Sequence, residues 1–177
     1  YAVIFDKKLF EYLQKNLENL LQLQQDFVLN IISRCSQLKA QAVARDEKET
    51  KGYRLILNLG HTIGHALETS ASYTRKITHG EAVALGILCA CDISRNLGLL
   101  NDSEAERIED LIKKAGLPTK IKGLPVNKII KAVSYDKKII AGRQRFILPV
   151  CIGHVIVCND LDGSLIKMAV EKRSSDD

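Results

Sequence analysis

The chain has 177 residues, 46% of them hydrophobic and 27% charged, and this ordinary composition suits one globular domain with a full core. The net charge of +5 comes from lysines and arginines scattered among acidic residues, and aromatic residues are few, so no nucleic-acid partner is expected. No apolar run is long enough to span a bilayer and nothing resembles a signal peptide, so we expect a cytoplasmic protein with no membrane partner. Because the first residue is Tyr1 rather than methionine, we expect a fragment or a processed chain.

The cysteines are expected to be reduced thiols, because their number is odd and no two of them form a CxxC pair. Cys89 and Cys91 are two apart in a helical pattern, so their side chains should point to different faces and cannot hold one metal ion together. The complete set is Cys35, Cys89, Cys91, Cys151 and Cys158.

Two helices are predicted at the start of the chain. Asp6 can cap a first, short helix that runs through Leu17. A longer helix is predicted from about Leu20 to Glu47, because its apolar residues keep helical spacing and no glycine or proline interrupts them. The charged run that closes it is typical of a solvated helix end.

The most informative stretch follows, because three of the four histidines lie between residues 61 and 79. If the chain is helical from Thr62, His61 and His65 project from one face, one turn apart, and can meet at one metal ion. The competing interpretation is structural, since a histidine pair with this spacing is often incidental. His79 is far enough along the chain to return on a second element and join them.

Polar residues flank the apolar run just before the histidines. Arg54 and Asn58 need partners if this run is buried, and an anionic ligand beside a metal ion would supply them. Their spacing of four residues predicts that both can hold one anionic group. Downstream, Thr78-x-x-Glu81 fits a capping box, so Glu81 can act as no more than a cap for a helix from His79 to before Gly98.

The second half is predicted to be mostly helical. Ser103-x-x-Glu106 is a second capping box, which opens a helix that ends at Gly116. Pro125 is expected to start a short helix, with Asp136–Lys138 in the turn after it.

A β-hairpin is predicted from two apolar runs, Arg145–Val150 and Val155–Cys158, joined around Gly153, with His154 as a structural residue in the turn. A last helix, Leu161–Glu171, completes a mainly helical domain over residues 1–173, and residues 174–177 are expected to form a disordered tail.

The motifs resemble those of the 3-dehydroquinate synthase family. NLGHTIGH and HGEAVALG resemble its signature, further stretches resemble other family blocks in the expected order, and the resemblance runs from Tyr1 to about Asn159. The blocks are Lys39 with Asp46–Glu49, Asn58–His65, His79–Gly86, Asp136–Lys138 and Arg145–Pro149. The resemblance implies the family's multi-helix C-terminal domain with a small β-hairpin, without the NAD-binding α/β domain. The sequence has no dinucleotide-binding fingerprint.

The resemblance also implies a metal site. It assigns His61 and His79 as ligands of Zn²⁺ or Co²⁺, with a glutamate upstream of Tyr1 as the third ligand. On spacing alone His65 could be that third ligand, whereas the resemblance implies that it contacts the substrate. The cofactor NAD⁺ is expected to be bound mainly by the absent domain, and no residue of this chain is assigned to it.

The family converts 3-deoxy-D-arabino-heptulosonate 7-phosphate to 3-dehydroquinate and phosphate in the shikimate pathway, by NAD⁺-dependent transient oxidation, phosphate elimination, reduction and aldol cyclisation. A substrate with a carboxylate and a phosphate needs cationic partners. The resemblance assigns catalytic roles to His65 and Lys39. The residues that it implies for substrate binding are Lys39, Glu49, Arg54, Asn58, His65, Lys137 and Lys138.

Three other interpretations remain open. The chain could belong to another sugar phosphate cyclase, such as a 2-deoxy-scyllo-inosose or valiolone-type synthase. It could belong to an iron- or zinc-dependent alcohol dehydrogenase, against which the context of the motifs argues. It could also be a non-catalytic, metal-binding helical module. The expected partners are a sugar phosphate substrate, the N-terminal NAD-binding domain of the same enzyme and a second copy in a homodimer. The fragment alone is expected to be inactive.

Overall fold

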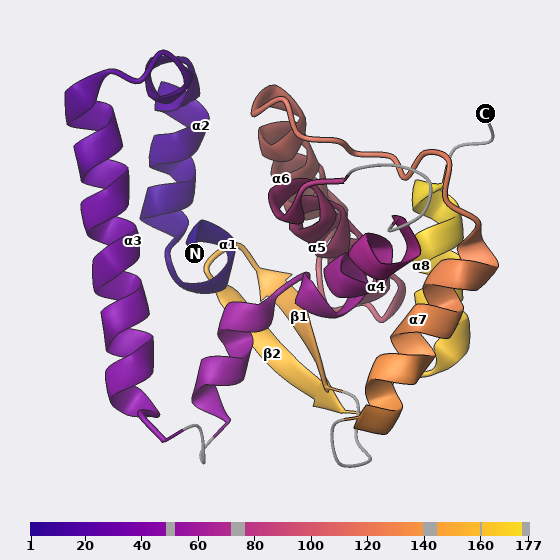
Figure 1. Cartoon of the computed structure of the whole chain (residues 1–177). Helices are drawn as coiled ribbons and strands as arrows, with labels where there is room; N and C mark the ends of the chain where they lie inside the picture. The colour runs from indigo at the N-terminus through magenta and orange to yellow at the C-terminus, as the bar shows by residue number, and fades with distance from the viewer. Residues whose placement is uncertain (49–51, 72–76, 140–144, 160, 175–177) are drawn as a thin grey trace.

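The computed structural model describes residues 1–48, 52–71, 77–139, 145–159 and 161–174, with the side chains of residues 136–139 left out. A mainly helical fold with one small antiparallel β-hairpin confirms the expected fold class (Figure 1). No helix in these ranges is both long and apolar enough to cross a membrane. The elements are α1 (Ala2–Phe5), α2 (Lys7–Leu21), α3 (Gln25–Arg45), the 3₁₀ helix η1 (Tyr53–Asn58), α4 (His61–Ala71), α5 (His79–Asn96), α6 (Asp102–Lys114), α7 (Val126–Ile139), β1 (Arg145–Cys151), β2 (His154–Asn159) and α8 (Gly163–Arg173).

The elements form two groups, on either side of the β-hairpin (Figure 1). Helices α2 and α3 stand side by side as an antiparallel pair, and α4, α5, α7 and α8 pack around the main core on the other side. Fully buried Leu67, Leu88 and Ile129 belong to the apolar faces of α4, α5 and α7. A second cluster, around Phe10 and Ile108, joins α2 to α6.

The break between the first two long helices differs from the prediction. Helix α2 continues to Leu21 and α3 starts only at Gln25, so the predicted start of the second helix at Leu20 is wrong. Between them Leu23 adopts a left-handed conformation with φ of 56° and is largely exposed. The turn contains no glycine or proline, and the apolar spacing continues through it, so it could not be predicted from the sequence pattern.

Asp6 caps α2, as predicted, and also ties it to α3. Its carboxylate accepts hydrogen bonds from the backbone N–H of Leu9 (3.0 Å) and from Nε of Arg34 (2.6 Å). Burial raises the pKa of Asp6, but these hydrogen bonds and the Arg34 charge outweigh burial and lower the pKa overall.

Replacing Asp6 with asparagine is therefore expected to destabilise the fold in a pH-dependent way. Asparagine can still cap α2 but loses the charged contact with Arg34, so we expect a loss of about 1–2 kcal/mol at pH 7. Because the folded-state pKa is lowered, the charged contribution is present above the unfolded-state pKa of about 3.9 and disappears as the pH falls through the folded value. Urea unfolding of both proteins at pH 7 and pH 3 measures this, and an equal difference at both values would contradict it.

The N-terminus of α6 also differs from the prediction. Its cap is Asn101, whose side chain accepts the backbone N–H of Glu104 at 2.8 Å, so the predicted capping pair of Ser103 and Glu106 is wrong. Glu104 also accepts the backbone N–H of Ile152 at 3.0 Å, which links α6 to the hairpin. The same sequence therefore contains two overlapping capping patterns, and this contact favours the earlier one.

The hairpin pairs Arg145 with Asn159 and continues to Cys151 opposite His154, which confirms the predicted strands. Helix α7 extends to Ile139, so the backbone of residues 136–138 is helical and the prediction of a turn there is wrong. The last helix begins at Gly163, capped by Asp162, and ends at Arg173. The boundary of the domain at residue 173 stays a prediction. So does the disorder of the tail, of which residues 175–177 lie outside the described residues, while the backbone N–H of Ser174 donates to the carbonyl oxygen of Val170 at 2.9 Å.

Helix α8 is held by a buried ion pair. Nε of Arg173 contacts Oδ2 of Asp92 on α5 at 2.5 Å, and Nη1 contacts Glu109 on α6 at 2.8 Å. Both Asp92 and Arg173 are buried, and their charges are compensated by each other, with Lys172 as a further partner of Asp92 and Glu109 as a further partner of Arg173. The C-terminal helix is thereby fixed against the helix that begins with His79.

Candidate metal centre

The three clustered histidines come together at the start of two helices. His61 is the first residue of α4, His65 lies one turn later, and His79 is the first residue of α5. The ring centroids lie 5.6 Å apart for His61 and His65, 5.4 Å for His61 and His79, and 6.0 Å for His65 and His79. The predicted meeting of His79 with the histidine pair is confirmed.

A capping box fixes the position of His79. The Thr78 side chain accepts the backbone N–H of Glu81 at 3.3 Å, and the Glu81 carboxylate accepts the backbone N–H of Thr78 at 2.9 Å. The predicted capping role of Glu81 is therefore confirmed. Because α5 begins at this cap, the imidazole of His79 is set beside α4.

Glycines fix the position of His61. The backbone just before α4 lies directly against α5, where a Cβ atom on Gly86 would be only 1.9 Å from the carbonyl oxygen of Gly60. Gly60 itself has a φ of 79°, which favours glycine. Helix α4 also lies close to α5 at Gly64, where a Cβ atom would be 3.2 Å from the carbonyl oxygen of Ala82. This close approach brings the histidines of the two helices within reach of one another.

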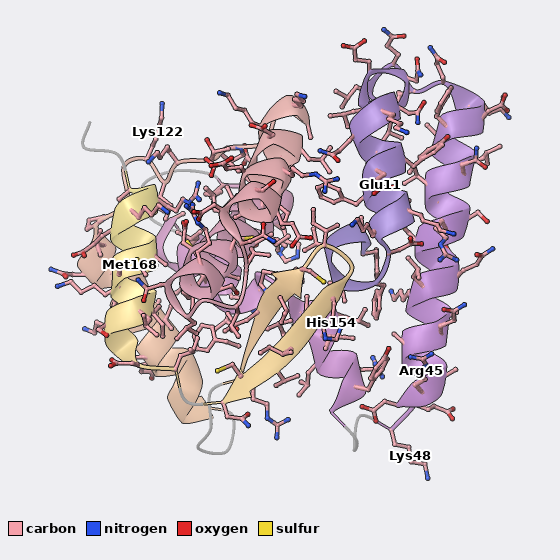
Figure 2. The ribbon with its side chains drawn as sticks, turned by 180° about the vertical axis from the view of Figure 1, so that it is seen from behind. Glu11, Arg45, Lys48, Lys122, His154 and Met168 are labelled. Atoms are coloured by element: carbon pink, nitrogen blue, oxygen red, sulfur yellow. The ribbon has the colours of Figure 1, made fainter. Side chains whose placement is uncertain are left out.

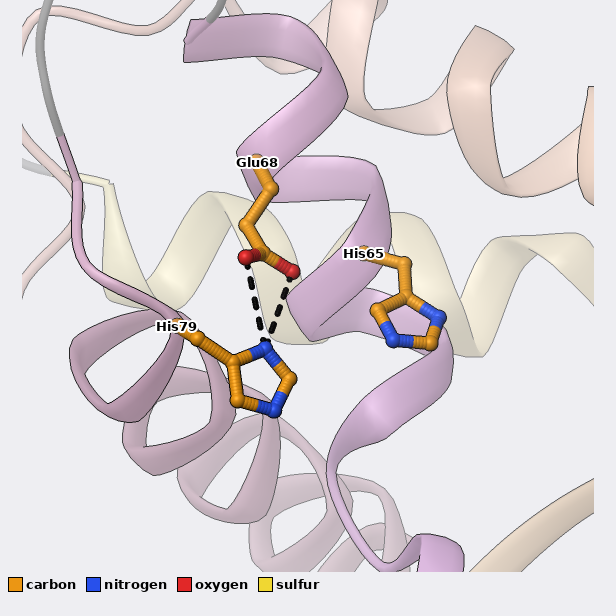
Figure 3. A group of neighbouring side chains, drawn as sticks. All are labelled: His65, Glu68 and His79. Carbon is orange, nitrogen blue, oxygen red and sulfur yellow. Dashed lines mark hydrogen bonds and ion pairs between the residues drawn. The ribbon is translucent and has the colours of Figure 1, made fainter.

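Glu68 also belongs to the cluster. It lies one turn after His65 on α4, and its carboxylate oxygens are 3.2 and 3.3 Å from Nδ1 of His79 (Figure 3). Ligand atoms of His65, Glu68 and His79 all lie within 4.8 Å of one another. Sequence reasoning did not identify Glu68 as a site residue, although its spacing from His61 and His65 places it on the same helical face.

The donor atoms fit a divalent metal ion. Imidazole nitrogens and a carboxylate oxygen are ligands that Zn²⁺ and Co²⁺ accept. His65 and His79 are exposed, so the cluster is open to solvent on one side. His61 does not belong to the group of closest ligand atoms, but its Nδ1 is 3.2 Å from the carbonyl oxygen of Leu59, and a hydrogen bond there leaves Nε2 available.

The predicted substrate residues on η1 are arranged differently from the expectation. A 3₁₀ helix has three residues per turn, so Arg54 and Asn58 do not share a face as they would in an α-helix. Nη1 of Arg54 donates to the carbonyl oxygen of Glu47 at 3.4 Å, and its backbone N–H donates to buried Asp46 at 3.3 Å. Asn58 is exposed. The local geometry therefore does not support the expectation that Arg54 and Asn58 bind one anionic group together.

Of the other predicted substrate residues, Lys39 has a described side chain, and the structure does not bring it to the histidines. Lys39 is exposed on α3, which packs against α2 and η1 on the far side of the hairpin from α4 (Figure 1). Glu49 lies outside the described residues, as do the side chains of Lys137 and Lys138.

A separate cavity of about 660 Å³ lies between α1, α3, η1 and β2. Arg45 and His154, both labelled in Figure 2, belong to its walls on α3 and β2. Nη1 of Arg45 donates to the Tyr53 hydroxyl at 2.7 Å, and both residues line the cavity. None of the residues predicted to bind metal or substrate lines this cavity, so it is distinct from the histidine cluster.

Most of the chain, including the histidine cluster, matches the model of a known protein family. The family model described as 3-dehydroquinate synthase C-terminal matches residues 1–139, which include η1, the histidine cluster and both helices that carry it. The chain belongs to the 3-dehydroquinate synthase family.

Individual 3-dehydroquinate synthases are similar over almost the whole chain. The protein of Caldanaerobacter subterraneus subsp. tengcongensis is 41% identical over 168 residues, which are 95% of this chain and 47% of the relative. That of Rippkaea orientalis is 44% identical over 170 residues, which are 94% of this chain and 46% of the relative. The chain thus spans about half the length of the curated 3-dehydroquinate synthases that it matches.

Solved structures of sugar phosphate cyclases share the fold. A 2-epi-5-epi-valiolone synthase from Streptomyces hygroscopicus subsp. jinggangensis, with NAD⁺ and Zn²⁺ bound, superposes with a TM-score of 0.84 at 23% identity, over 97% of this chain and 47% of that chain. A 2-deoxy-scyllo-inosose synthase, complexed with carbaglucose-6-phosphate, NAD⁺ and Co²⁺, gives 0.67 at 26% identity, over 81% of this chain and 40% of that chain. This likeness supports the assignment to the C-terminal part of the 3-dehydroquinate synthase fold.

Proposed function

We propose that this chain is the metal- and substrate-binding half of a 3-dehydroquinate synthase. The proposed reaction converts 3-deoxy-D-arabino-heptulosonate 7-phosphate to 3-dehydroquinate and phosphate. The observation that carries the proposal is the convergence of His61, His65 and His79 at the adjoining starts of α4 and α5, in a chain that matches this family.

His61 and His79 are the proposed metal ligands, and the ion is Zn²⁺ or Co²⁺. When bound, the metal supplies Lewis acidity at a substrate hydroxyl, and NAD⁺ supplies the hydride acceptor. Relatives of known structure bind NAD⁺ with Zn²⁺ or Co²⁺, which supports this pairing. In our proposal NAD⁺ is bound mainly by an N-terminal domain that is not part of the chain.

Polar side chains of this half orient the substrate in the proposal. His65 lies beside His79, where its exposed imidazole can hydrogen-bond a substrate oxygen and exchange a proton with it. Arg54 and Asn58 provide donors on η1, the segment that leads into His61, and Lys39 provides a second cationic group and takes part in catalysis. Lys137, Lys138 and Glu49 complete the proposed set.

The assay for this proposal is phosphate release by the full-length protein with NAD⁺ and zinc. One reaction contains 3-deoxy-D-arabino-heptulosonate 7-phosphate, and a parallel one contains sedoheptulose 7-phosphate. Release from the first substrate, abolished by a chelator, is the expected result. The chain without an NAD-binding half is expected to release none.

A second candidate is another sugar phosphate cyclase, because both solved relatives named above are of that kind. Phosphate release only from sedoheptulose 7-phosphate would favour a valiolone-type synthase over our proposal. No release from either substrate, with zinc bound, would favour a non-catalytic metal-binding module.

A cytoplasmic homodimer is the working form that we propose, as the family resemblance implies.

Arg54→Ala is expected to weaken substrate binding while zinc stays in place. A hydrogen bond to a charged group contributes about 1.5–3 kcal/mol, so we expect KM for the heptulosonate phosphate to rise by about 10- to 150-fold. Steady-state kinetics and metal content of the full-length protein measure the two effects. The control is Arg95→Ala, which removes a surface contact with Asp102. Arg95 lies near the C-terminal end of α5, whereas His79 is the first residue of that helix. An unchanged KM, or a loss of zinc, would contradict the assigned role.

A further inference from the structure

Glu68 makes a contact that the proposed metal site does not account for. Its carboxylate reaches from α4 to α5 and meets Nδ1 of His79 with both oxygens, at 3.2 and 3.3 Å. The two residues are eleven positions apart in the sequence, so the contact exists only because the two helices pack together.

The contact matters because an imidazole has two distinct nitrogens. A carboxylate that accepts a hydrogen bond at Nδ1 keeps the proton on that atom and leaves the lone pair on Nε2. Figure 3 shows Nδ1 of His79 facing Glu68 and the second ring nitrogen on the side away from it. Outer carboxylates of this kind orient histidine ligands in many metal proteins and raise their basicity.

We propose that Glu68 is a positioning residue, which holds His79 in the Nδ1–H tautomer and directs Nε2 toward the metal ion. The inference rests on the proposed function only in taking His79 as a metal ligand. It adds that Glu68 acts as the hydrogen-bond partner of His79 and does not itself bind the metal ion.

The surroundings of the pair support a fixed orientation. Glu68 directly follows fully buried Leu67 on α4, so its backbone is anchored in the core, and its side chain is 33% exposed. The backbone of His79 is held by the capping box of Thr78 and Glu81. The other nearby carboxylate, that of Glu81, bonds to Thr78 in this cap. Glu68 is thus placed to restrict the rotation of the His79 ring, which is otherwise 57% exposed.

The alternative is that Glu68 itself binds the metal ion, since its oxygens lie within 4.8 Å of ligand atoms of His65 and His79. Both oxygens of Glu68, however, contact Nδ1 of His79. The proposed metal ion binds at Nε2, on the other side of the imidazole ring. The geometry therefore favours positioning over ligation, and the two roles predict different results in the absence of metal.

The test uses the full-length protein with Glu68→Ala, Glu68→Gln and, as a matched control, Glu106→Gln on the exposed face of α6. Long-range ¹H–¹⁵N NMR spectra of the metal-free protein report the tautomer of His79, and competition with a chromophoric chelator gives the zinc Kd. We expect the Nδ1–H tautomer in the unmodified protein, loss of this preference in Glu68→Ala, and a zinc Kd raised about 10- to 100-fold. Glu68→Gln keeps an acceptor oxygen, so its Kd should rise less, and Glu106→Gln should match the unmodified protein.

Two results would overturn the inference. One is an unchanged tautomer and an unchanged zinc Kd in Glu68→Ala. The other is weaker zinc binding with an unchanged tautomer in the metal-free protein, which would make Glu68 a ligand. Phosphate release by the unmodified protein is measured separately, because it tests the proposed reaction and not the role of Glu68. If it is absent while tautomer and Kd still respond to Glu68, the positioning role stands and the proposed reaction is wrong.

Discussion

Full-length protein carrying His79→Ala is expected to bind no zinc at stoichiometric level and to release no phosphate, while it remains folded. A catalytic zinc site usually has three protein ligands, so the loss of one leaves a site that holds the ion weakly. The side chain of His79 is 57% exposed, so its removal leaves no cavity in the core. His61→Ala should have the same effect on zinc and activity. Metal content after gel filtration, phosphate release and circular dichroism measure the three properties.

The fourth histidine provides the matched control. His154 is exposed at the start of β2 and lines the separate cavity beside α3. His154→Ala should therefore retain zinc and activity. Normal zinc content in His61→Ala or His79→Ala would remove the basis for the assigned metal centre, whatever the activity of those variants.

Gly86→Ala is expected to be the most destabilising of the substitutions considered. The new Cβ atom would lie 1.9 Å from the carbonyl oxygen of Gly60, and both partners are backbone, so neither can move aside by a change of rotamer. Relief requires α4 and α5 to separate, at a cost of about 3 kcal/mol or more. The same separation would move His61 away from His79, so zinc affinity should fall together with stability.

Gly163→Ala is the control for this substitution. Gly163 begins α8, has no left-handed φ, and a Cβ atom there would meet nothing within 4 Å. Urea unfolding of both variants gives the change in the free energy of unfolding, and chelator competition gives the zinc Kd. A Gly86→Ala protein within 1 kcal/mol of the unmodified one would contradict the close contact of the two helices.

Local sequence patterns predicted those parts of the fold that depend on local interactions. The hairpin and the capped start of α5 could be predicted because alternation and capping residues act within a few positions. The turn at Leu23 could not, because it has neither glycine nor proline and the apolar spacing does not change there. The start of α6 could not be placed from the sequence because two capping patterns overlap there, and the contact of Glu104 with distant Ile152 favours one of them.

The same distinction applies to the site. The meeting of His61, His65 and His79 could be predicted from their spacing and from a family resemblance. Glu68 could not be assigned a partner, because its contact with His79 depends on how glycines allow α4 and α5 to approach. Arg54 and Asn58 were expected on an α-helical spacing, and the tighter turn of η1 separates them.

The close contact between Gly60 and Gly86 has a consequence for the order of assembly. Because the backbone of α5 lies directly against the backbone that leads into α4, the histidines are brought together when this half folds, and the conformational entropy of gathering these ligands is lost at that step. Association with an NAD-binding half then requires little further ordering of the histidine ligands, so more of the contact energy remains for affinity. The cluster is also exposed on one side, so a metal ion can enter it before that association. In the proposed enzyme, metal loading and the association of the two halves are thereby separable steps.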